Sequence, residues 1–111
     1  MSNCIFCEIV RNKMKAQIIY EDDNYLAFHD INPQAPVHFL VIPKKHLENV
    51  LDADLKMLGD LFNLAVREAE KIGLSRDGFR TVINCGRHAG QSVNHLHIHV
   101  MGGRWFSWPP G

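Results

Sequence analysis

The sequence predicts an α+β fold with an antiparallel sheet, and three observations lead to this class. Short β-prone runs occur both before residue 45 and after residue 78. One long amphipathic helix lies between them, which is typical of folds that segregate a helix from an antiparallel sheet. Near the C-terminus, the run His95-Leu96-His97-Ile98-His99-Val100 places a histidine at every second residue, the side-chain period of a β-strand.

The N-terminal half is expected to contain a short helix and three strands. Apolar residues recur at helical spacing within residues 5–10. Residues 18–21 and 25–29 are β-prone and are separated by a polar Asp-Asp-Asn trio that suits a tight turn, which predicts a hairpin. Residues 37–42 are rich in β-branched and aromatic side chains, and Pro43 ends this third strand.

The longest predicted element is a helix over residues 53–72, where apolar side chains recur at steps of three and four. Asp52 is the expected N-cap and Gly73 the expected C-terminal stop. Five charged side chains fall mostly on the opposite face and are expected to be solvated: Lys56, Asp60, Arg67, Glu68 and Lys71.

The last two strands are expected at residues 79–84 and 95–101, joined by a glycine-bearing loop over residues 86–93. In the second strand, alternation would turn three histidines to one face and three aliphatic side chains into the core. Histidine titrates near neutral pH and serves as nucleophile, general acid/base or metal ligand. Because Thr, Lys or Glu would serve a solvated face equally well, the row of histidines predicts a reaction centre.

Length and composition favour one domain over residues 1–111. Acidic and basic residues balance at 12 each, so the sequence carries no electrostatic footprint for nucleic acid or a membrane surface. Residues 1–4 do not begin a basic and apolar leader, and no window approaches the ~20 apolar residues of a membrane span. Three cysteines are too few for a disulfide framework, which favours reduced thiols and a cytoplasmic location.

The loop before the histidine run has the composition of an anion-binding loop. Two glycines within residues 86–92 allow backbone N–H groups to approach a ligand, while Gln91 adds an amide and Ser92 a hydroxyl. This is not the Walker pattern, and a plain tight turn explains Gly90 equally well. Next to three histidines, the loop is a candidate for phosphoryl recognition, whereas His88 is expected to be an exposed loop residue.

Cys4 and Cys7 have metal-ligand spacing. Zinc would need two further ligands, and His46 and His95 are the natural donors because both lie at ends of predicted strands. The alternative is that the two cysteines are reduced thiols packed beside the first helix.

Three apolar residues and one carboxylate suggest a nucleoside pocket. Asp30 lies at a strand end, where it could accept hydrogen bonds from ribose hydroxyls or simply form a turn. Ile5, Phe6 and Ile31 could line a pocket for a planar base, although packing is the usual role of such residues.

Together these segments resemble the histidine triad (HIT) family. The matching segments are Phe28-His29-Asp30-Ile31, residues 38–46, Gly90-Gln91-Ser92-Val93, residues 95–101, Gly102-Gly103-Arg104 and Trp108-Pro109-Pro110-Gly111. The tail is similar to the purine nucleoside phosphoramidase (Hint) branch rather than to dinucleoside polyphosphate hydrolases or nucleotidyltransferases.

The resemblance implies a homodimer in which two five-stranded antiparallel sheets join into one, with the long helix near the interface. It implies hydrolysis of purine nucleoside 5′-phosphoramidates, which are derivatives of AMP or GMP, to the monophosphate and an amine. No metal or other cofactor is required for that step. In several family members with paired N-terminal cysteines, a structural zinc is held by residues matching Cys4, Cys7, His46 and His95.

The resemblance also implies a role for each matching residue. His97 would attack the α-phosphorus, and the carbonyl of His95 would hold its tautomer. His99 and His38 would contact the phosphate. The remaining nucleotide contacts would come from Ser92 and the amide of Val93 on the phosphate oxygens, Gln91 and Asn84 nearby, Asp30 on the ribose, and Ile5, Phe6 and Ile31 around the base.

Three other functions agree with parts of the pattern. A nucleotide-binding scaffold would bind nucleotide without turnover, and a dinucleoside polyphosphate hydrolase would prefer dinucleotides. A metalloenzyme could use the three histidines as ligands, but alternate residues of one strand lie roughly 6.6 Å apart at Cα, which makes convergence on one ion difficult.

Overall fold

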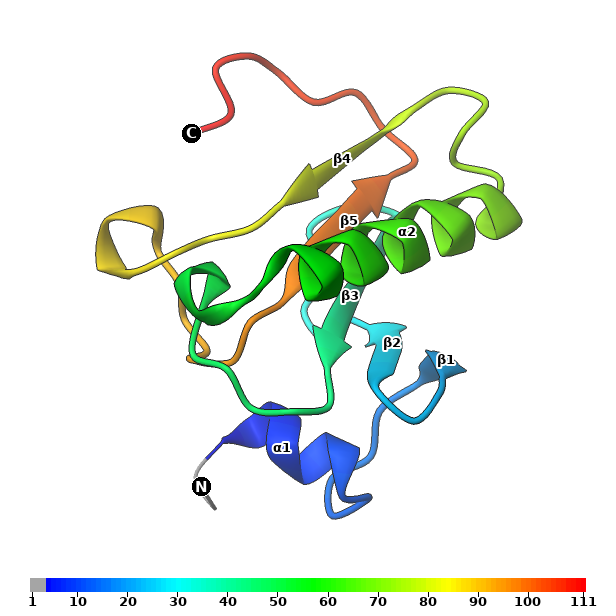
Figure 1. Ribbon diagram of the computed structural model, residues 1–111. Coiled ribbons are helices and arrows are strands. Elements are labelled where there is room, and N and C mark those ends of the chain that lie inside the picture. Colours follow the sequence, from blue (N-terminus) through cyan, green and yellow to red (C-terminus); the bar gives the residue numbers. More distant parts are fainter. Residues whose placement is uncertain (1–3) are drawn as a thin grey trace.

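The computed structural model describes residues 4–111; residues 1–3, where no leader is expected, lie outside the described part. Two of its strands follow the long helix along the chain (Figure 1). The elements are α1 (Ile5–Val10), β1 (Ile18–Glu21), β2 (Tyr25–His29), β3 (Val37–Pro43), α2 (Leu55–Ile72), β4 (Phe79–Val82) and β5 (Ile98–Gly102). Short 3₁₀ turns occupy Val50–Asp52 and Arg87–Ala89.

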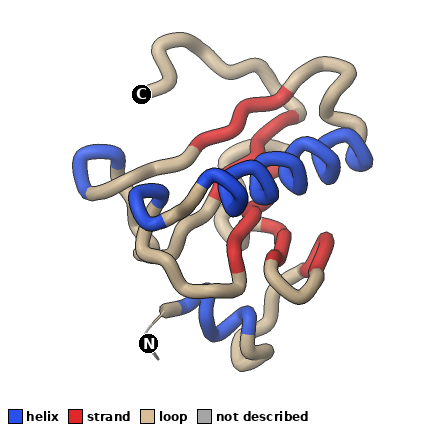
Figure 2. The backbone as a smooth tube through the Cα atoms, in the orientation of Figure 1, coloured by secondary structure: helices blue, strands red, loops and turns tan. Residues whose placement is uncertain are grey.

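The five strands form one sheet in the order β1-β2-β3-β5-β4, and every neighbouring pair is antiparallel. The predicted α+β class, with a long and a short helix, is therefore confirmed. Figure 2 shows the strands gathered behind α2, with loops forming much of the surrounding chain. In the register of β3 and β5, Leu40 lies opposite His99 and His38 lies opposite Met101. Alternation then puts His38 and His99 on the same face of the sheet.

Both faces of the central strands are buried. The face under α2 packs Phe39 and Val41 of β3 against the helix, together with Leu96, Ile98 and Val100. The opposite face carries the following apolar side chains, including two from α1: Phe6, Ile9, Leu26, Phe28, Leu40 and Ile42. Burial of each such side chain stabilises the fold by about 1.5–3 kcal/mol. The aliphatic residues of the histidine run point into the helix-covered core, as alternation predicts.

Helix α2 begins two residues later than expected. Ala53 has extended backbone angles, and Asp54 is the N-cap because its side chain accepts a 2.8 Å hydrogen bond from the N–H of Met57. Asp52 belongs instead to the preceding 3₁₀ turn. Gly73 ends the helix in the left-handed conformation, with φ 95°, as predicted. Glu68 is buried rather than solvated, and Lys71 Nζ lies 3.2 Å from its carboxylate.

Two predicted strands are shorter than expected. Strand β4 ends at Val82 rather than Asn84, and β5 begins at Ile98 rather than His95. Continuing the β3–β5 register would pair Leu96 with Pro43, which has no N–H to extend the ladder. The N–H of Leu96 donates instead to the carbonyl of Leu47 at 2.7 Å. His95 and His97 are therefore held by loop contacts just before the strand.

No helix within residues 4–111 combines the length and the apolar character needed to span a bilayer.

Candidate active site

Three histidines gather on the sheet face opposite α2. His97 and His38 are almost fully buried, and His99 is half-buried. The Nε2 atom of His38 lies 2.9 Å from Nδ1 of His99, and the ring centroids of His97 and His99 are 4.9 Å apart. The ring of Phe6 packs edge-on against His97 at 5.2 Å. Two strands and helix α1 thus hold the imidazoles in one cluster.

The hydrogen bond of His97 determines which of its nitrogens is nucleophilic. Its Nδ1 lies 2.7 Å from the carbonyl oxygen of His95, which can only accept, so Nδ1 carries the hydrogen. The lone pair of the neutral ring is then on Nε2. Sequence reasoning reached this contact only by family resemblance.

A chain of hydrogen bonds orients His99 in the same way. The backbone N–H of Gln34 donates to Nδ1 of His38 at 3.0 Å. Nε2 of His38 therefore carries a hydrogen in the neutral ring, and it donates to Nδ1 of His99. His99 in turn carries its hydrogen on Nε2. The cluster presents a lone pair on His97 and an N–H donor on His99, which is the pairing that attack on a phosphorus centre needs.

Burial keeps these rings neutral at pH 7. Desolvation lowers the pKa of His97 and of His38 below the ordinary value of 6.5, against smaller raising effects of the His95 carbonyl on His97 and of Asp30 on both rings. The pKa of His99 falls to about 4, first through burial and then through repulsion by His97 and His38. A neutral His97 retains the lone pair that a nucleophile requires.

The same hydrogen bonds argue against a metal ion in this cluster. Single donor atoms of Asp30, His38 and His99 lie within 4.8 Å of one another. However, His38 Nδ1 accepts from Gln34, so its Nε2 carries a hydrogen and has no lone pair for a metal. His95 is directed to a different cluster. The geometry does not support the hypothesis of a three-histidine metalloenzyme.

Gln91 braces the phosphate-binding loop proposed from sequence. Its Oε1 accepts from the N–H of Gly86 at 2.9 Å, while Nε2 donates to the carbonyls of Glu48 at 2.7 Å and Val93 at 3.0 Å. Gly86 and Gly90 both have positive φ, which favours glycine. Both ends of the Gln91 amide are thus engaged within the protein and hold the loop in shape, while its contact with a nucleotide stays a prediction.

Other residues predicted for the nucleotide pocket occupy different environments. Ser92, which shortly precedes the histidine run in the sequence, is exposed, whereas Asn84 and Val93 are half-buried. Phe6 is buried against Phe28, as a core residue would be. Ile31 is 96% exposed and Ile5 is 41% exposed. These two apolar side chains are available for a ligand.

Asp30 links the pocket to the histidines. Its Oδ2 lies 3.3 Å from Nε2 of His38, and its Oδ1 accepts from the N–H of Asn32 at 2.8 Å. The carboxylate thus forms a turn, which was one of the two alternatives for this residue, and it also lies beside the histidine cluster; its contact with ribose hydroxyls stays a prediction.

Cys4, Cys7, His46 and His95 form a second cluster whose donor atoms all lie within 4.8 Å of one another. Nδ1 of His95 lies 3.3 Å from the sulfur of Cys4, 3.6 Å from that of Cys7 and 3.2 Å from Nδ1 of His46. Tetrahedral zinc would separate two nitrogens by about 3.3 Å and a nitrogen from a sulfur by about 3.6 Å. The four side chains fit that geometry.

The surroundings of the second cluster suit a metal as well. Cys4 caps helix α1, and its sulfur accepts from the N–H of Cys7 at 3.4 Å, which brings both thiols to one turn. Nε2 of His95 donates to the carbonyl of Pro43 at 2.8 Å and leaves Nδ1 free to ligate. Burial lowers the pKa of His95 to about 4, so the ring is neutral, as a ligand must be.

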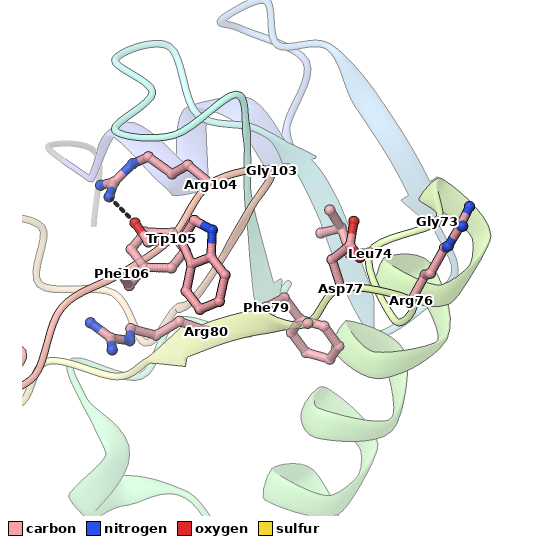
Figure 3. Close-up of a pocket in the computed structure, with 11 residues that line it drawn as sticks. Gly73, Leu74, Arg76, Asp77, Phe79, Arg80, Gly103, Arg104, Trp105 and Phe106 are labelled. Atoms are coloured by element: carbon pink, nitrogen blue, oxygen red, sulfur yellow. Dashed lines mark hydrogen bonds between the residues drawn. The ribbon is translucent and has the colours of Figure 1, made fainter.

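A cavity of about 930 Å³ lies away from both clusters, between the turn after α2, strand β4 and the C-terminal tail (Figure 3). It contains no histidine. Its lining residues are Gly73, Leu74, Arg76, Asp77, Gly78, Phe79, Arg80, Gly103, Arg104, Trp105 and Phe106. The chemistry of the site is therefore concentrated in the histidine cluster and not in this cavity.

Sequence reasoning missed the groups that set the tautomers of His38 and His95. They are the backbone N–H of Gln34 and the backbone carbonyl of Pro43. Because every residue carries a backbone carbonyl and every residue except proline an N–H, no residue type could have signalled them.

An antiparallel sheet that bears a buried, neutral histidine cluster, preceded in the chain by a glycine-bearing loop, defines an α+β domain with an imidazole lone pair available at its site. The chain matches the HIT domain over residues 11–105, and it belongs to that family. It is 53% identical to an uncharacterized HIT-like protein of Synechocystis sp. over 110 residues, covering 96% of each chain.

Solved structures agree with this assignment. A HIT family hydrolase from Legionella pneumophila superposes with a TM-score of 0.94 and 44% identity, covering 98% of this chain and 100% of that one. A zinc-bound histidine triad family protein from Mycobacterium smegmatis is 35% identical with a TM-score of 0.83, covering 93% and 76% of the two chains. The chain is thus similar to HIT family hydrolases.

Proposed function

We propose that the protein hydrolyses the P–N bond of purine nucleoside 5′-phosphoramidates, as the Hint branch of the family does. The observation that carries the proposal is the 2.7 Å hydrogen bond from His97 Nδ1 to the carbonyl of His95. It directs the lone pair of a buried neutral imidazole to Nε2, beside the N–H donor of His99. The tail Trp108-Pro109-Pro110-Gly111 is the sequence feature that favours this branch.

The reaction would proceed in two displacements. His97 Nε2 attacks the α-phosphorus, the P–N bond to the amine breaks, and the leaving nitrogen takes a proton from solvent. Water then attacks the nucleotidyl-histidine and returns a proton to solvent, the bond from phosphorus to His97 breaks, and the nucleoside monophosphate leaves. One water molecule is consumed, and His97 returns to its neutral form with the lone pair on Nε2.

The remaining residues would hold the phosphate and the nucleoside. His99 would donate from Nε2 to the phosphate, where negative charge develops, while Ser92 and the N–H of Val93 would contact its other oxygens. His38 would orient His99 rather than touch the phosphate, because both of its nitrogens are engaged within the protein. Asn84 would assist from the loop.

The nucleoside would lie where the exposed apolar residues and Asp30 meet. Asp30 would accept hydrogen bonds from the ribose hydroxyls, and Ile5 and Ile31 would contact the purine with Phe6 behind them. The Asp30 carboxylate, whose side chain is 18% exposed, and the two exposed isoleucines support this placement.

A zinc ion held by Cys4, Cys7, His46 and His95 would be structural. It would join helix α1 to the segment before β5, and it would take no part in the displacement. The near-tetrahedral spacing of the donor atoms and the zinc-bound relative support this assignment.

We also propose that the protein is a homodimer. Leu55, Phe62 and Val66 lie at helical steps along α2 and are 89%, 38% and 42% exposed. Strand β4 is a sheet edge, so its unpaired backbone groups can extend the sheet. An exposed apolar stripe and an open edge both support association with a second copy.

The proposal is tested by replacing His97 with glycine and measuring turnover of adenosine and guanosine phosphoramidates beside dinucleoside polyphosphates. Turnover should be abolished while AMP binding persists. His88→Asn is the control, because His88 is exposed in the loop over residues 86–93. Turnover by the His97 variant, or wild-type binding of AMP without any turnover, would contradict the proposal. Faster cleavage of dinucleotides would assign the other hydrolase branch.

A further inference from the structure

Arg104 joins the C-terminal tail to the loop between β2 and β3. Its Nη2 and Nε donate to the carbonyl of Gln34 at 3.0 and 3.3 Å, across 70 residues of sequence. Its Nη1 donates to the carbonyl of Trp105 at 2.9 Å, and the guanidinium lies 4.2 Å from the ring centroid of Phe106. Figure 3 shows Arg104 extending from the segment that follows Gly103.

The residue that Arg104 holds is the one that sets the tautomer of His38. The N–H of Gln34 donates to His38 Nδ1, and its carbonyl receives the two bonds from Arg104. The surrounding loop is solvent-exposed, with Ile31 at 96%, so contacts such as these must determine its conformation. Gly103 supports the same junction: it has φ 92°, and an added Cβ would lie 2.9 Å from Pro36.

We propose that Arg104 is a positioning residue that binds the Gln34 carbonyl, fixes the Gln34 backbone so that its N–H faces His38 and, through His38, keeps the hydrogen of His99 on Nε2. The inference rests on the proposed function, since it assigns the donor that would face the phosphate. Arg104 itself touches neither the histidines nor the expected reaction centre in this arrangement.

Loss of the Gln34 contact would remove the only donor to His38 Nδ1 among the described residues, while Asp30 Oδ2, 3.3 Å from Nε2, would still favour a hydrogen on Nε2, so His38 would populate both tautomers. His38 could then carry its hydrogen on Nδ1 and accept at Nε2 from Nδ1–H of His99. His99 would present a lone pair, and not a donor, to an anionic phosphate. One tautomer of His99 therefore attracts the phosphate, where negative charge develops, and the other repels it.

A neighbouring arginine provides a matched control. Arg80 on β4 also lies over the ring of Phe106, at 5.1 Å, and also donates to a tail carbonyl, that of Ser107 at 3.0 Å. Arg104→Gln and Arg80→Gln thus each remove a cation from the same aromatic ring and a bond to the tail. Only Arg104→Gln also releases Gln34.

The tautomers are read directly from two-bond ¹H–¹⁵N spectra of protein labelled with ¹⁵N-histidine. Wild type and Arg80→Gln should show His38 and His99 protonated on Nε2, whereas Arg104→Gln should show both rings populating the Nδ1 form. Arg104→Lys keeps the charge but lacks the planar guanidinium, so its population of the Nδ1 form should lie between those of wild type and Arg104→Gln. It also provides a milder substitution if Arg104→Gln does not fold. Unchanged tautomers in Arg104→Gln would overturn the proposal.

Turnover of an adenosine phosphoramidate provides the second measurement. Misplacement of a catalytic donor should lower kcat of Arg104→Gln by about 10- to 100-fold, with KM changed much less, and leave Arg80→Gln near wild type. Equal losses in both variants would indicate a general effect of the tail and would overturn the positioning role. If wild type lacks turnover, the proposed function fails, while the spectra still decide the role of Arg104.

Discussion

The lowered pKa of His99 makes the stability of the fold depend on pH. In the folded protein this pKa is about 4, against an ordinary value of 6.5. As the pH falls, the unfolded chain therefore binds a proton at this residue before the folded chain does. The stabilisation is fully present above about pH 6.5 and is lost as the pH falls toward about 4.

The magnitude follows from the difference between the two pKa values. At about pH 4.5 the imidazole of His99 is almost fully protonated in the unfolded chain but mostly neutral in the folded one. Proton linkage then lowers the free energy of unfolding by about 2.5 kcal/mol relative to about pH 7.5. This is a large share of the stability of a small domain, which is typically about 5–15 kcal/mol.

Urea unfolding at several pH values, followed by circular dichroism, measures this contribution. His99→Asn removes the titrating ring, so between about pH 7.5 and about pH 4.5 it should lose about 2.5 kcal/mol less than wild type. Titrating groups outside the histidine cluster are shared by both proteins and contribute equally. His88→Asn should behave as wild type, since His88 is exposed. Equal pH dependence in wild type and His99→Asn would refute the reasoning.

Two further outcomes concern the metal cluster and the dimer. Metal analysis should find about one zinc per chain in wild type but none in Cys7→Ser. Cys85→Ser should keep its zinc, because Cys85 lies outside the four-residue cluster. Zinc retained by Cys7→Ser would contradict the assignment. Light scattering should show that the wild type is a dimer and that Val66→Glu is a monomer. Met14→Glu, which alters a similarly exposed apolar residue, should remain dimeric. A dimeric Val66→Glu would exclude the exposed apolar stripe of α2 as the interface.

Local patterns in the sequence were sufficient for most of the fold. Alternation along residues 95–101 correctly separated the histidines from the aliphatic core residues, because side-chain direction follows the backbone over two residues. The helical steps of α2 and its glycine stop were likewise local signals. The N-cap was missed because Asp52 and Asp54 are the same residue type, and only the backbone conformation distinguishes them.

The sequence by itself determined which residue types were available for chemistry: the alternating histidines, the cysteine pair and the glycine-bearing loop. The tertiary structure decided the state of each histidine. Pro43 ends the ladder and accepts from His95, His95 accepts from His97, and Gln34, whose carbonyl binds Arg104, donates to His38. An imidazole is a nucleophile or a donor according to its hydrogen-bond partners. Those partners are mainly backbone groups brought together by folding, so no sequence pattern could specify them.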